Sequence, residues 1–326
     1  MAITPYGEAS DDTEGQGVGT HLEGKAVVIT GAGRGIGRAI ALAAAAEGAS
    51  VVVADYGGAV DRRGAVSSEA ADHVVAEIEA AGGKAVPVAV DVSTMEGGRQ
   101  IVQAAVDSFG RLDGMLCCAG ISVTKYLWEL EEQEWDDVIA VHIKGHFSCA
   151  QAAAKVMMEQ RSGSMLFFSS GALTGMPNAT AYATAKAGIL GFTWSTAYAL
   201  ERYGITTNCL IPSAATRMSD SIYENAGTIS KRFGDTMRSE LAAGTYRDPA
   251  NIAPLAIYLL SDAARDINGQ VFRVQGYEIA HMAGVAFDKT MTSIGPWEVD
   301  AIASRLPEKL GPALSLLPVP WPEPKA

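Results

Sequence analysis

The sequence predicts an α/β fold: a single doubly wound domain with a seven-stranded parallel sheet, followed by a C-terminal extension. Short apolar runs alternate with helical segments between residues 21 and 280. Strands that are apolar along their whole length are typical of a parallel sheet covered by helices on both faces. A glycine-rich turn between the first apolar run and the first helical segment makes the expected domain Rossmann-type.

The expected elements follow from this alternation. Seven strands are expected at residues 26–29, 51–54, 85–90, 115–118, 164–168, 206–211 and 270–274. Helices are expected at residues 36–47, 67–81, 97–109, 131–159 and 181–203. Pro249 opens a further helix, because proline is favoured in the first turn. The polar segment 213–246 is expected to be irregular.

The two ends of the chain differ in composition from this domain. Residues 1–20 are rich in Gly, Asp, Glu and Thr without apolar periodicity, which predicts a flexible N-terminal tail. Residues 281–326 form a proline-rich extension with one expected helix near 297–306. We expect this extension to wrap the surface of the domain or of a neighbouring molecule.

Composition excludes several classes of protein. Of the 326 residues, 48% are hydrophobic and 19% are charged, which is enough for a sizeable core. The net charge of −12 argues against nucleic-acid and anionic-membrane partners, since phosphate binding requires clustered Lys and Arg. The four cysteines lack zinc-ligand or CxxC spacing, so we expect no metal and a reduced, cytoplasmic protein. We find neither a signal peptide nor a membrane-spanning segment.

The glycine-rich turn predicts a dinucleotide site. Residues 30–37, Thr-Gly-Ala-Gly-Arg-Gly-Ile-Gly, place Gly31, Gly35, Ile36 and Gly37 between the first strand and the first helix. There the backbone must turn tightly and approach a pyrophosphate at the helix N-terminus. A glycine-rich turn without a ligand is the alternative, and the strand–turn–helix context argues against it.

Asp55 favours NAD over NADP as the cofactor. It ends the second strand, where a carboxylate accepts hydrogen bonds from both ribose hydroxyls of NAD and repels the 2′-phosphate of NADP. Arg34 in the glycine turn could pair with that phosphate, but Asp55 lies closer to the discriminating position. Asp91 and Val92 end the third strand and are expected beside the adenine; for Asp91, capping of a loop is the alternative.

Tyr182 and Lys186 are candidates for proton transfer. They are four residues apart on an expected helix and therefore share one face. A nearby ammonium and a positive nicotinamide would both lower the pKa of the phenol, so that Tyr182 could take a hydroxyl proton. Ser170, at the end of a strand, would hold the substrate oxygen. Taken alone, this spacing is common by chance, and a pair on a helix surface is the alternative.

In combination, these motifs resemble the short-chain dehydrogenase/reductase family over about residues 22–278. The resemblance implies a Rossmann fold, a Ser-Tyr-Lys centre in which Tyr182 and Lys186 also contact NAD, and a homotetramer or dimer. It also implies further cofactor contacts from Cys118, Ala119 and Gly120 and from Pro212 and Thr216. Loops such as residues 53–58, 80–84 and 141–145 look like the (3R)-hydroxyacyl-CoA dehydrogenase-like, multifunctional-enzyme branch in actinobacteria.

Three departures from the family pattern bear on the site. Cys118 stands where the family has an Asn that ties central strands together. His142 replaces an Asn that acts through its main-chain carbonyl, so the imidazole either fills the space of that Asn or relays protons. Counting back from Tyr182 selects Ser169 as the catalytic serine, whereas counting along the strand selects Ser170. We choose Ser170, because a loop loses a residue more easily than a strand does.

The sequence therefore predicts an NAD-dependent oxidoreductase that interconverts a secondary alcohol and a ketone. A bulky apolar substrate, such as a hydroxyacyl-CoA, a steroid or a terpenoid, is suggested by the apolar residues of the expected substrate loop: Met218, Ile222, Tyr223, Phe233 and Met237. Ordinary packing of a lid is the alternative for this set. A small-ketone or quinone reductase and a non-catalytic NAD-binding sensor or scaffold are the competing functions.

Overall fold

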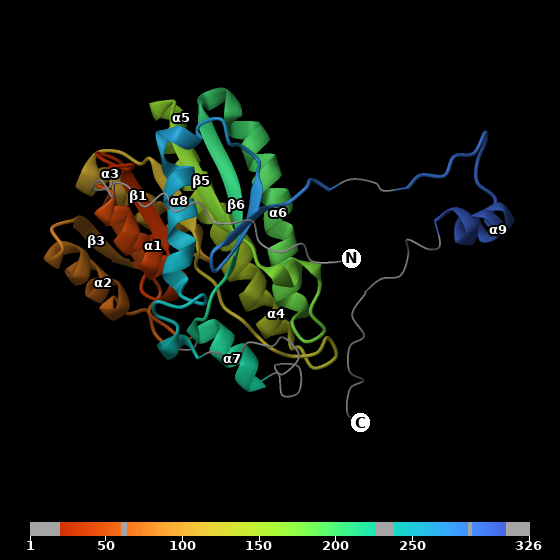
Figure 1. Cartoon of the computed structure of the whole chain (residues 1–326), viewed down its shortest axis with the longest axis horizontal. Coiled ribbons are helices and arrows are strands. Elements are labelled where there is room, and N and C mark those ends of the chain that lie inside the picture. The colour runs from red at the N-terminus through yellow and green to blue at the C-terminus, as the bar shows by residue number, and fades with distance from the viewer. Residues whose placement is uncertain (1–19, 60–63, 226–237, 286–288, 311–326) are drawn as a thin grey trace, which may run out of the picture. The chain divides into compact units, whose positions relative to one another are not determined.

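The computed structural model (Figure 1) describes residues 20–59, 64–225, 238–285 and 289–310. The chain divides into two compact units, Met1–Met282 and Ala283–Ala326. The expected N-terminal tail lies outside the described residues except for Thr20. The first unit contains the expected domain.

One sheet runs through the first unit, in the order β3-β2-β1-β4-β5-β6-β7-β8. The first seven strands pair in parallel, as predicted. Five of them, β1, β2, β4, β5 and β6, are buried along most of their length, which explains why apolar runs marked them in the sequence, whereas β3 and β7 are partly buried. The strands are β1 (Ala26–Thr30), β2 (Ser50–Asp55), β3 (Lys84–Ala89), β4 (Gly114–Cys117), β5 (Gly163–Phe168), β6 (Ile205–Ser213), β7 (Val271–Gln275) and β8 (Glu278–His281).

The eighth strand, β8, was not expected, and it pairs antiparallel with β7. Gln275 pairs with Glu278 across a two-residue turn, in which Gly276 adopts φ +54°. A positive φ at the first residue of such a turn suits glycine and matches the twist of a hairpin. Apolar periodicity did not reveal β8, because three of its four residues are exposed.

Helices cover both faces of the sheet, so the domain is doubly wound (Figure 1). Buried residues of α1, α2 and α8 belong to the core on one face of the sheet. Buried residues of α3, α5 and α6 belong to the core on the other face. The nine labelled helices are α1 (Gly35–Ala46), α2 (Glu69–Ala80), α3 (Met95–Phe109), α4 (Glu132–Ile139), α5 (Gly145–Gln160), α6 (Thr180–Leu200), α7 (Arg217–Asn225), α8 (Ala253–Leu260) and α9 (Val299–Lys309).

The helix expected at residues 131–159 is divided in two. A π-helical turn, Ala140–Lys144, joins α4 to α5, and the Gly145 N–H bonds to the carbonyl of Ala140, five residues earlier. Hydrophobic periodicity does not distinguish one widened turn from a regular helix. Such π-turns recur at functional sites, and this one carries His142.

Helix α7 lies in the segment that was expected to be irregular. Its start is capped reciprocally: the Ser219 hydroxyl accepts a hydrogen bond from the Thr216 N–H at 2.8 Å, and the Thr216 hydroxyl accepts one from the Ser219 N–H at 3.4 Å. The prediction was wrong because the helix is mostly polar, so local capping rather than apolar periodicity begins it.

The second unit contains α9, which begins two residues later than the expected helix and ends at Lys309. The Arg305 guanidinium lies 5.0 Å from the centroid of the Trp297 ring, a cation–π contact that holds the segment before α9 against the helix. No helix among the described residues of either unit is long and apolar enough to cross a membrane.

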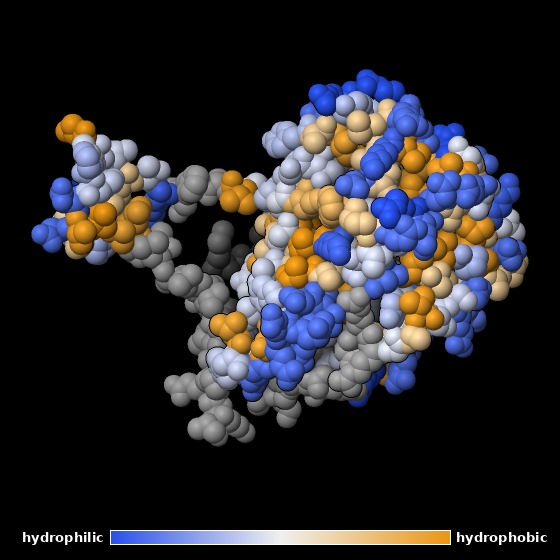
Figure 2. All heavy atoms as spheres, turned by 180° about the vertical axis from the view of Figure 1, so that it is seen from behind, coloured by the Kyte–Doolittle hydropathy of each residue, from blue (hydrophilic) through white to orange (hydrophobic). Residues whose placement is uncertain are grey.

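Polar and apolar side chains are mixed over the face of the first unit that Figure 2 shows. Several large apolar side chains are exposed among the described residues, of which Tyr198 on α6 and Tyr277 in the β7–β8 turn are the most exposed aromatic ones, at 82% and 76%. Single exposed apolar residues are normal on soluble proteins.

A buried carboxylate fastens the amino end of the sheet. The Asp113 side chain is 4% exposed and accepts hydrogen bonds from the Ala26 N–H at 2.9 Å and from the Arg111 guanidinium at 2.7 Å. Ala26 begins β1, and Asp113 directly precedes β4. Asp113 therefore fixes how the two central strands start relative to each other.

We expect Asp113→Ala to lower the free energy of unfolding by about 2–3 kcal/mol, because it leaves a buried N–H of β1 unpaired and removes a charged acceptor. Urea unfolding followed by circular dichroism measures the change. The control is Asp107→Ala, which removes an exposed carboxylate on α3 and should change stability by less than about 0.5 kcal/mol. Equal effects of the two substitutions would contradict the role of Asp113.

Candidate active site

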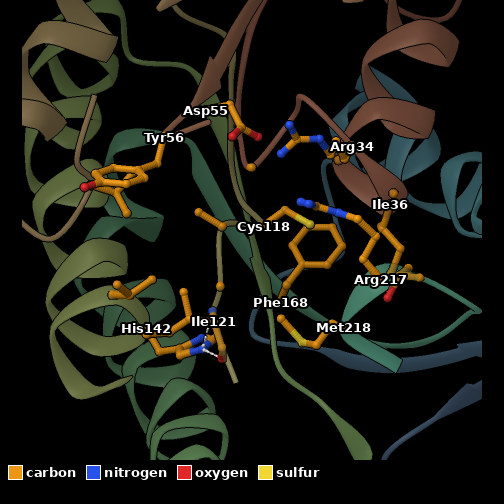
Figure 3. A pocket seen from close by; sticks show the side chains of 18 of the residues that line it. Arg34, Ile36, Asp55, Tyr56, Cys118, Ile121, His142, Phe168, Arg217 and Met218 are labelled. Atoms are coloured by element: carbon orange, nitrogen blue, oxygen red, sulfur yellow. Dashed lines mark hydrogen bonds between the residues drawn. The ribbon is translucent and has the colours of Figure 1, made fainter. Parts of the chain in front are cut away.

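A pocket opens at the carboxyl ends of β1 and β4, where the order of the strands reverses (Figure 3). In doubly wound sheets, ligands bind at this switch point. All the residues predicted to contact the cofactor line this one pocket: Gly31, Arg34, Gly35, Ile36, Gly37, Asp55, Asp91, Val92, Cys118, Ala119, Gly120, Tyr182, Lys186, Pro212 and Thr216.

The glycine turn is packed too closely for side chains. Gly31 adopts φ +66°, and a Cβ there would lie 2.8 Å from the Ala119 Cα. A Cβ on Gly37 would lie 2.2 Å from the Gly31 carbonyl oxygen. The turn therefore presents bare backbone at the start of α1, the arrangement that admits a pyrophosphate.

Asp55 lines the pocket at the end of β2. Its carboxylate accepts a hydrogen bond from the Gly33 N–H at 2.8 Å and another from the Gly57 N–H at 2.7 Å. These two bonds hold the carboxylate at the tip of β2, between the glycine turn and the loop that follows β2. A carboxylate has further lone pairs, so Asp55 can still accept hydrogen bonds from a bound ligand.

A threonine ties β1 to the segment after β4. The Thr30 hydroxyl accepts hydrogen bonds from the N–H groups of Cys118 and Ala119, both at 3.1 Å. This part of the pocket thus keeps a bond between the central strands although Cys118 replaces the family's Asn. Burial raises the pKa of the Cys118 thiol to about 12, so it is a neutral wall of the pocket.

Helix α6 presents Tyr182 and Lys186 to the pocket, on one face as predicted. Tyr182 is 8% exposed and Lys186 4%. The Lys186 ammonium lies 5.4 Å from the centroid of the Tyr182 ring and donates a hydrogen bond to the Phe168 carbonyl at 2.7 Å. The bond to the end of β5 fixes the ammonium beneath the ring.

The pKa of Tyr182 differs from the expectation. Burial raises it to about 12, although a hydrogen bond with Ser170 acts in the opposite direction. Burial also lowers the pKa of Lys186 to about 8. Burial destabilises the phenolate by more than the nearby groups of the chain stabilise it, so Tyr182 is a protonated phenol at neutral pH. Only a further positive charge in the pocket would favour the phenolate.

The two candidate serines have different partners. The Ser169 hydroxyl is buried and donates to the main-chain carbonyl of Lys186 at 2.7 Å, so it fixes α6 against β5. The Ser170 side chain lies within hydrogen-bonding reach of the Tyr182 phenol and also accepts from the Ala172 N–H at 3.3 Å. Ser169 is among the residues that line the pocket, whereas Ser170 is the serine that interacts with Tyr182, so the choice of Ser170 stays a prediction.

His142 is completely buried in the π-turn. Its Nε2 atom lies 2.8 Å from the Ile121 carbonyl oxygen and 3.2 Å from the Ile121 N–H nitrogen, as the dashed lines of Figure 3 show. The ring meets that of Tyr182 edge to face, with centroids 5.2 Å apart. It also fills the space beside Gly120, where a Cβ would lie 2.5 Å from the ring.

The electrostatics make His142 neutral. Burial, and next the charge of Lys186, lower its pKa well below the ordinary value, and its Nδ1 atom has no partner among the described residues. One turn later, His146 is buried too, and its pKa is lowered to about 3, first by burial. A neutral imidazole anchored to the backbone of Ile121 supports a role in holding the segment after β4 rather than in carrying protons.

Apolar side chains pack around Tyr182. The Met218 sulfur lies 3.7 Å from the Tyr182 hydroxyl oxygen. Met176, Val123 and Trp135 pack, as Met218 does, against the buried apolar cluster that contains Tyr182. Of the predicted substrate-loop residues, Phe233 and Met237 lie outside the described residues. For Ile222 and Tyr223, the structure gives the backbone of α7 and no side-chain placement.

Arg217 and Tyr56 line the pocket and were not predicted. Each directly follows a residue that was predicted, Thr216 and Asp55 respectively. No periodic or motif signal marks either one, because the direction of a side chain after a strand end depends on the loop that follows. Arg217 lies in the segment 213–246, which was expected to be irregular, so no predicted element directed its side chain toward the pocket.

Comparison with known proteins decides the family. Residues 25–227 match the model of the short chain dehydrogenase family. The chain belongs to the short-chain dehydrogenase/reductase family. It is similar to the hydroxyacyl-CoA dehydrogenase ChsB1 of Mycobacterium tuberculosis, with 35% identity over 91% of this chain and 95% of that protein. It is also 36% identical to the 3-oxoacyl-[acyl-carrier-protein] reductase FabG of Staphylococcus aureus, over 77% of this chain and 97% of the reductase.

A solved structure gives the same result. A short chain dehydrogenase from Mycobacterium avium superposes with a TM-score of 0.75 at 35% identity, over 90% of this chain and 96% of that one. The match to ChsB1 covers 91% of this chain, which is more residues than the first unit, Met1–Met282, contains. The match therefore extends into the second unit. The chain is thus a dehydrogenase/reductase that acts on CH–OH groups of a small molecule, in a family that uses NAD(P).

His142→Asn tests whether His142 is neutral in the folded protein, through the pH dependence of stability. An unfolded chain protonates this histidine below about pH 6.5, whereas the folded protein keeps it neutral. The stability that this histidine contributes is therefore present above about pH 6.5 and is lost as pH falls, by about 1.4 kcal/mol per pH unit. We expect the variant to lose stability less steeply than the wild type between about pH 6.5 and 5.

The same variant should keep any acidic limb of the pH–rate profile near pH 6–7, where an unperturbed histidine titrates. His73→Asn is the control, because His73 lies exposed on α2 and its removal should leave the acid slope unchanged. Loss of the acidic limb in His142→Asn alone would make the imidazole a proton carrier.

Proposed function

We propose that this protein is an NAD-dependent dehydrogenase that interconverts a secondary alcohol and a ketone on a bulky apolar substrate. The single observation that carries the proposal is the placement of Tyr182 and Lys186 in one pocket with the glycine turn, with Ser170 interacting with Tyr182. A nicotinamide dinucleotide fits the bare backbone of that turn and the carboxylate of Asp55. When bound, it supplies the hydride acceptor or donor.

Tyr182 would exchange the proton with the substrate oxygen. Because burial keeps its phenol protonated at neutral pH, Tyr182 is ready to donate a proton to a ketone oxygen. To accept a proton from an alcohol, it must first lose its own, which the positive charge of a bound oxidised nicotinamide would favour. Ser170 would share the substrate oxygen with Tyr182 and hold it at the distance that proton transfer requires.

The substrate oxygen must reach a place that Met218 now contacts. With its sulfur 3.7 Å from the Tyr182 hydroxyl, Met218 has to move aside when a substrate binds. A thioether on a flexible side chain gives way readily and still packs against an apolar ligand. Together with the acyl substrates that the relatives' names give, this favours an apolar substrate such as a hydroxyacyl thioester or a steroid.

Self-association belongs to the same proposal. Phe147 on α5 and Tyr198 on α6 are 42% and 82% exposed, and Tyr277 and Ile279 expose apolar surface beside β8. Burying such side chains favours association of copies of the chain. A homotetramer or dimer, as well as the cytoplasmic location, stays a prediction.

A panel of secondary alcohols tests the substrate class. The panel should contain a 3-hydroxyacyl-CoA, a hydroxysteroid, a terpenoid alcohol and a small alcohol such as 2-propanol, each incubated with NAD while NADH absorbance is followed. We expect turnover with bulky members and little with 2-propanol. A preference for the small alcohol would support a small-ketone reductase, and NAD binding without turnover of any member would support a sensor.

We expect Tyr182→Phe to keep NAD affinity and to lose most turnover, because only the hydroxyl that transfers the proton is removed. Positioned acid/base groups contribute about 10²–10⁴-fold to rate, so kcat should fall by at least about 100-fold while the NAD Kd stays within about threefold. Retention of more than about a tenth of wild-type kcat would exclude Tyr182 as the acid/base.

We expect NAD to be used in strong preference to NADP, since the fixed carboxylate of Asp55 would repel a 2′-phosphate. Asp55→Ser should reduce the ratio of the two kcat/KM values by at least about tenfold, mainly through better use of NADP. Asp55→Glu is the matched control that keeps the charge. Wild-type values within a factor of a few for the two cofactors would show that Arg34 dominates the choice.

A further inference from the structure

Two arginines of the pocket face the same space. Arg34 lies in the glycine turn and Arg217 begins α7, and Figure 3 shows both guanidinium groups pointing into the pocket. Among the described residues, neither forms an ion pair within 4.0 Å, and Arg34 reaches only the Gly58 carbonyl at 3.5 Å. Partial burial, and next the charge of Arg34, lower the pKa of Arg217, while the charge of Asp55 raises it.

Like charges converge here although the chain as a whole is acidic. The net charge of the chain is −12. Yet the pocket is lined by three cations, Arg34, Lys186 and Arg217, and by two carboxylates, Asp55 and Asp91. Two neighbouring guanidiniums repel each other unless an anion lies between them. The arrangement thus suits a ligand with negative charge at this end of the pocket.

The position of Arg217 identifies which part of a ligand it would meet. A Cβ on Gly35 would lie 3.3 Å from the Thr216 side chain, so the start of α7 packs directly on the start of α1. Thr216 caps α7 through Ser219, which fixes the next residue, Arg217, above the glycine turn. The backbone N–H groups of that turn are the ones that a pyrophosphate approaches.

We propose that Arg217 binds the diphosphate of the dinucleotide cofactor. This role rests on the proposed function, in which the pocket takes a nicotinamide dinucleotide. The Arg217 guanidinium would hold the diphosphate together with the backbone N–H groups of the glycine turn. Charge-assisted hydrogen bonds from arginine to phosphate oxygens are shorter and stronger than neutral ones.

The geometry separates this role from two others. A 2′-phosphate would lie at the tip of β2, where Asp55 is held and where Arg34 reaches Gly58, whereas Arg217 starts beside Gly35. A phosphate of a thioester substrate would enter from the side of Met218 and Tyr182. Because Arg217 and Met218 are neighbours in α7, a diphosphate bound by Arg217 also fixes the helix that places Met218 over Tyr182.

The test compares Arg217→Ala and Arg217→Lys with the wild type in direct binding, measured by calorimetry with NAD, NADP, ADP-ribose and adenosine. Arg99→Ala is the matched control, since Arg99 is an exposed arginine on α3, outside the pocket. In Arg217→Ala we expect Kd to rise at least about tenfold for the three ligands that contain a diphosphate, and to change less than about twofold for adenosine. Arg217→Lys should recover part of the loss, because it keeps the charge but not the planar fork.

Each alternative outcome contradicts the proposal. A loss confined to NADP would assign Arg217 to the 2′-phosphate. An equal loss for adenosine would show a deformed pocket, and no loss for any ligand would leave Arg217 without contact to the cofactor. The unliganded Arg217→Ala protein should unfold at a temperature no lower than the wild type, because the substitution removes a like-charge repulsion.

The proposed function can fail separately. If the wild type binds NADP and not NAD, the prediction of NAD is wrong, while the diphosphate of NADP and of ADP-ribose still tests Arg217. If the wild type binds neither dinucleotide, the proposed function and the role of Arg217 both fail.

Discussion

β1 and β4 pair side by side although β2 and β3 lie between them in sequence, and the rest of the site depends on this pairing. The chain leaves β1 toward one edge of the sheet and returns to β4 on its other side. The loops after these two strands therefore diverge and leave a gap at their carboxyl ends. The glycine turn lies on one side of this gap and residues 118–121 on the other. Asp113 fixes the opposite ends of the same two strands.

Burial governs the chemistry of the pocket in two ways. It raises the pKa of Tyr182 to about 12 and lowers that of Lys186 to about 8, so the phenol keeps its proton while the ammonium keeps most of its charge at neutral pH. It also keeps His142 and His146 neutral beside Lys186. The pocket thereby holds the Lys186 ammonium under the Tyr182 phenol, with the two buried imidazoles uncharged at neutral pH.

The departures from the family pattern are accommodated by neighbouring backbone. Where an Asn side chain would tie β1 to β4, the Thr30 hydroxyl bonds to the N–H groups of Cys118 and Ala119. His142 bonds to Ile121 in the segment that directly follows them. A hydroxyl and an imidazole thus hold the two ends of one short segment, so the wall of the pocket stays in place without the usual amide.

The sequence alone determined those features that depend on local chemistry. Apolar runs located seven parallel strands, the glycine spacing located the turn before α1, and the four-residue separation put Tyr182 and Lys186 on one face of α6. Each of these depends on neighbours in the chain, on the helical repeat, or on the burial of a whole strand. Asp55 could be assigned to the pocket for the same reason, since it lies where a strand ends, whereas Thr216 was assigned through the resemblance to the family.

Only the tertiary structure decided the rest. β8 is mostly exposed and exists because β7 offers it an edge, and α7 is polar and is started by a cap. Whether Ser169 or Ser170 faces Tyr182 depends on how β5 packs against α6. The charge state of His142 depends on its complete burial. The convergence of Arg34 with Arg217 depends on two segments that lie more than a hundred residues apart in the chain. Pattern within a sequence carries no information about such distances, because burial and charge act through space and not along the chain.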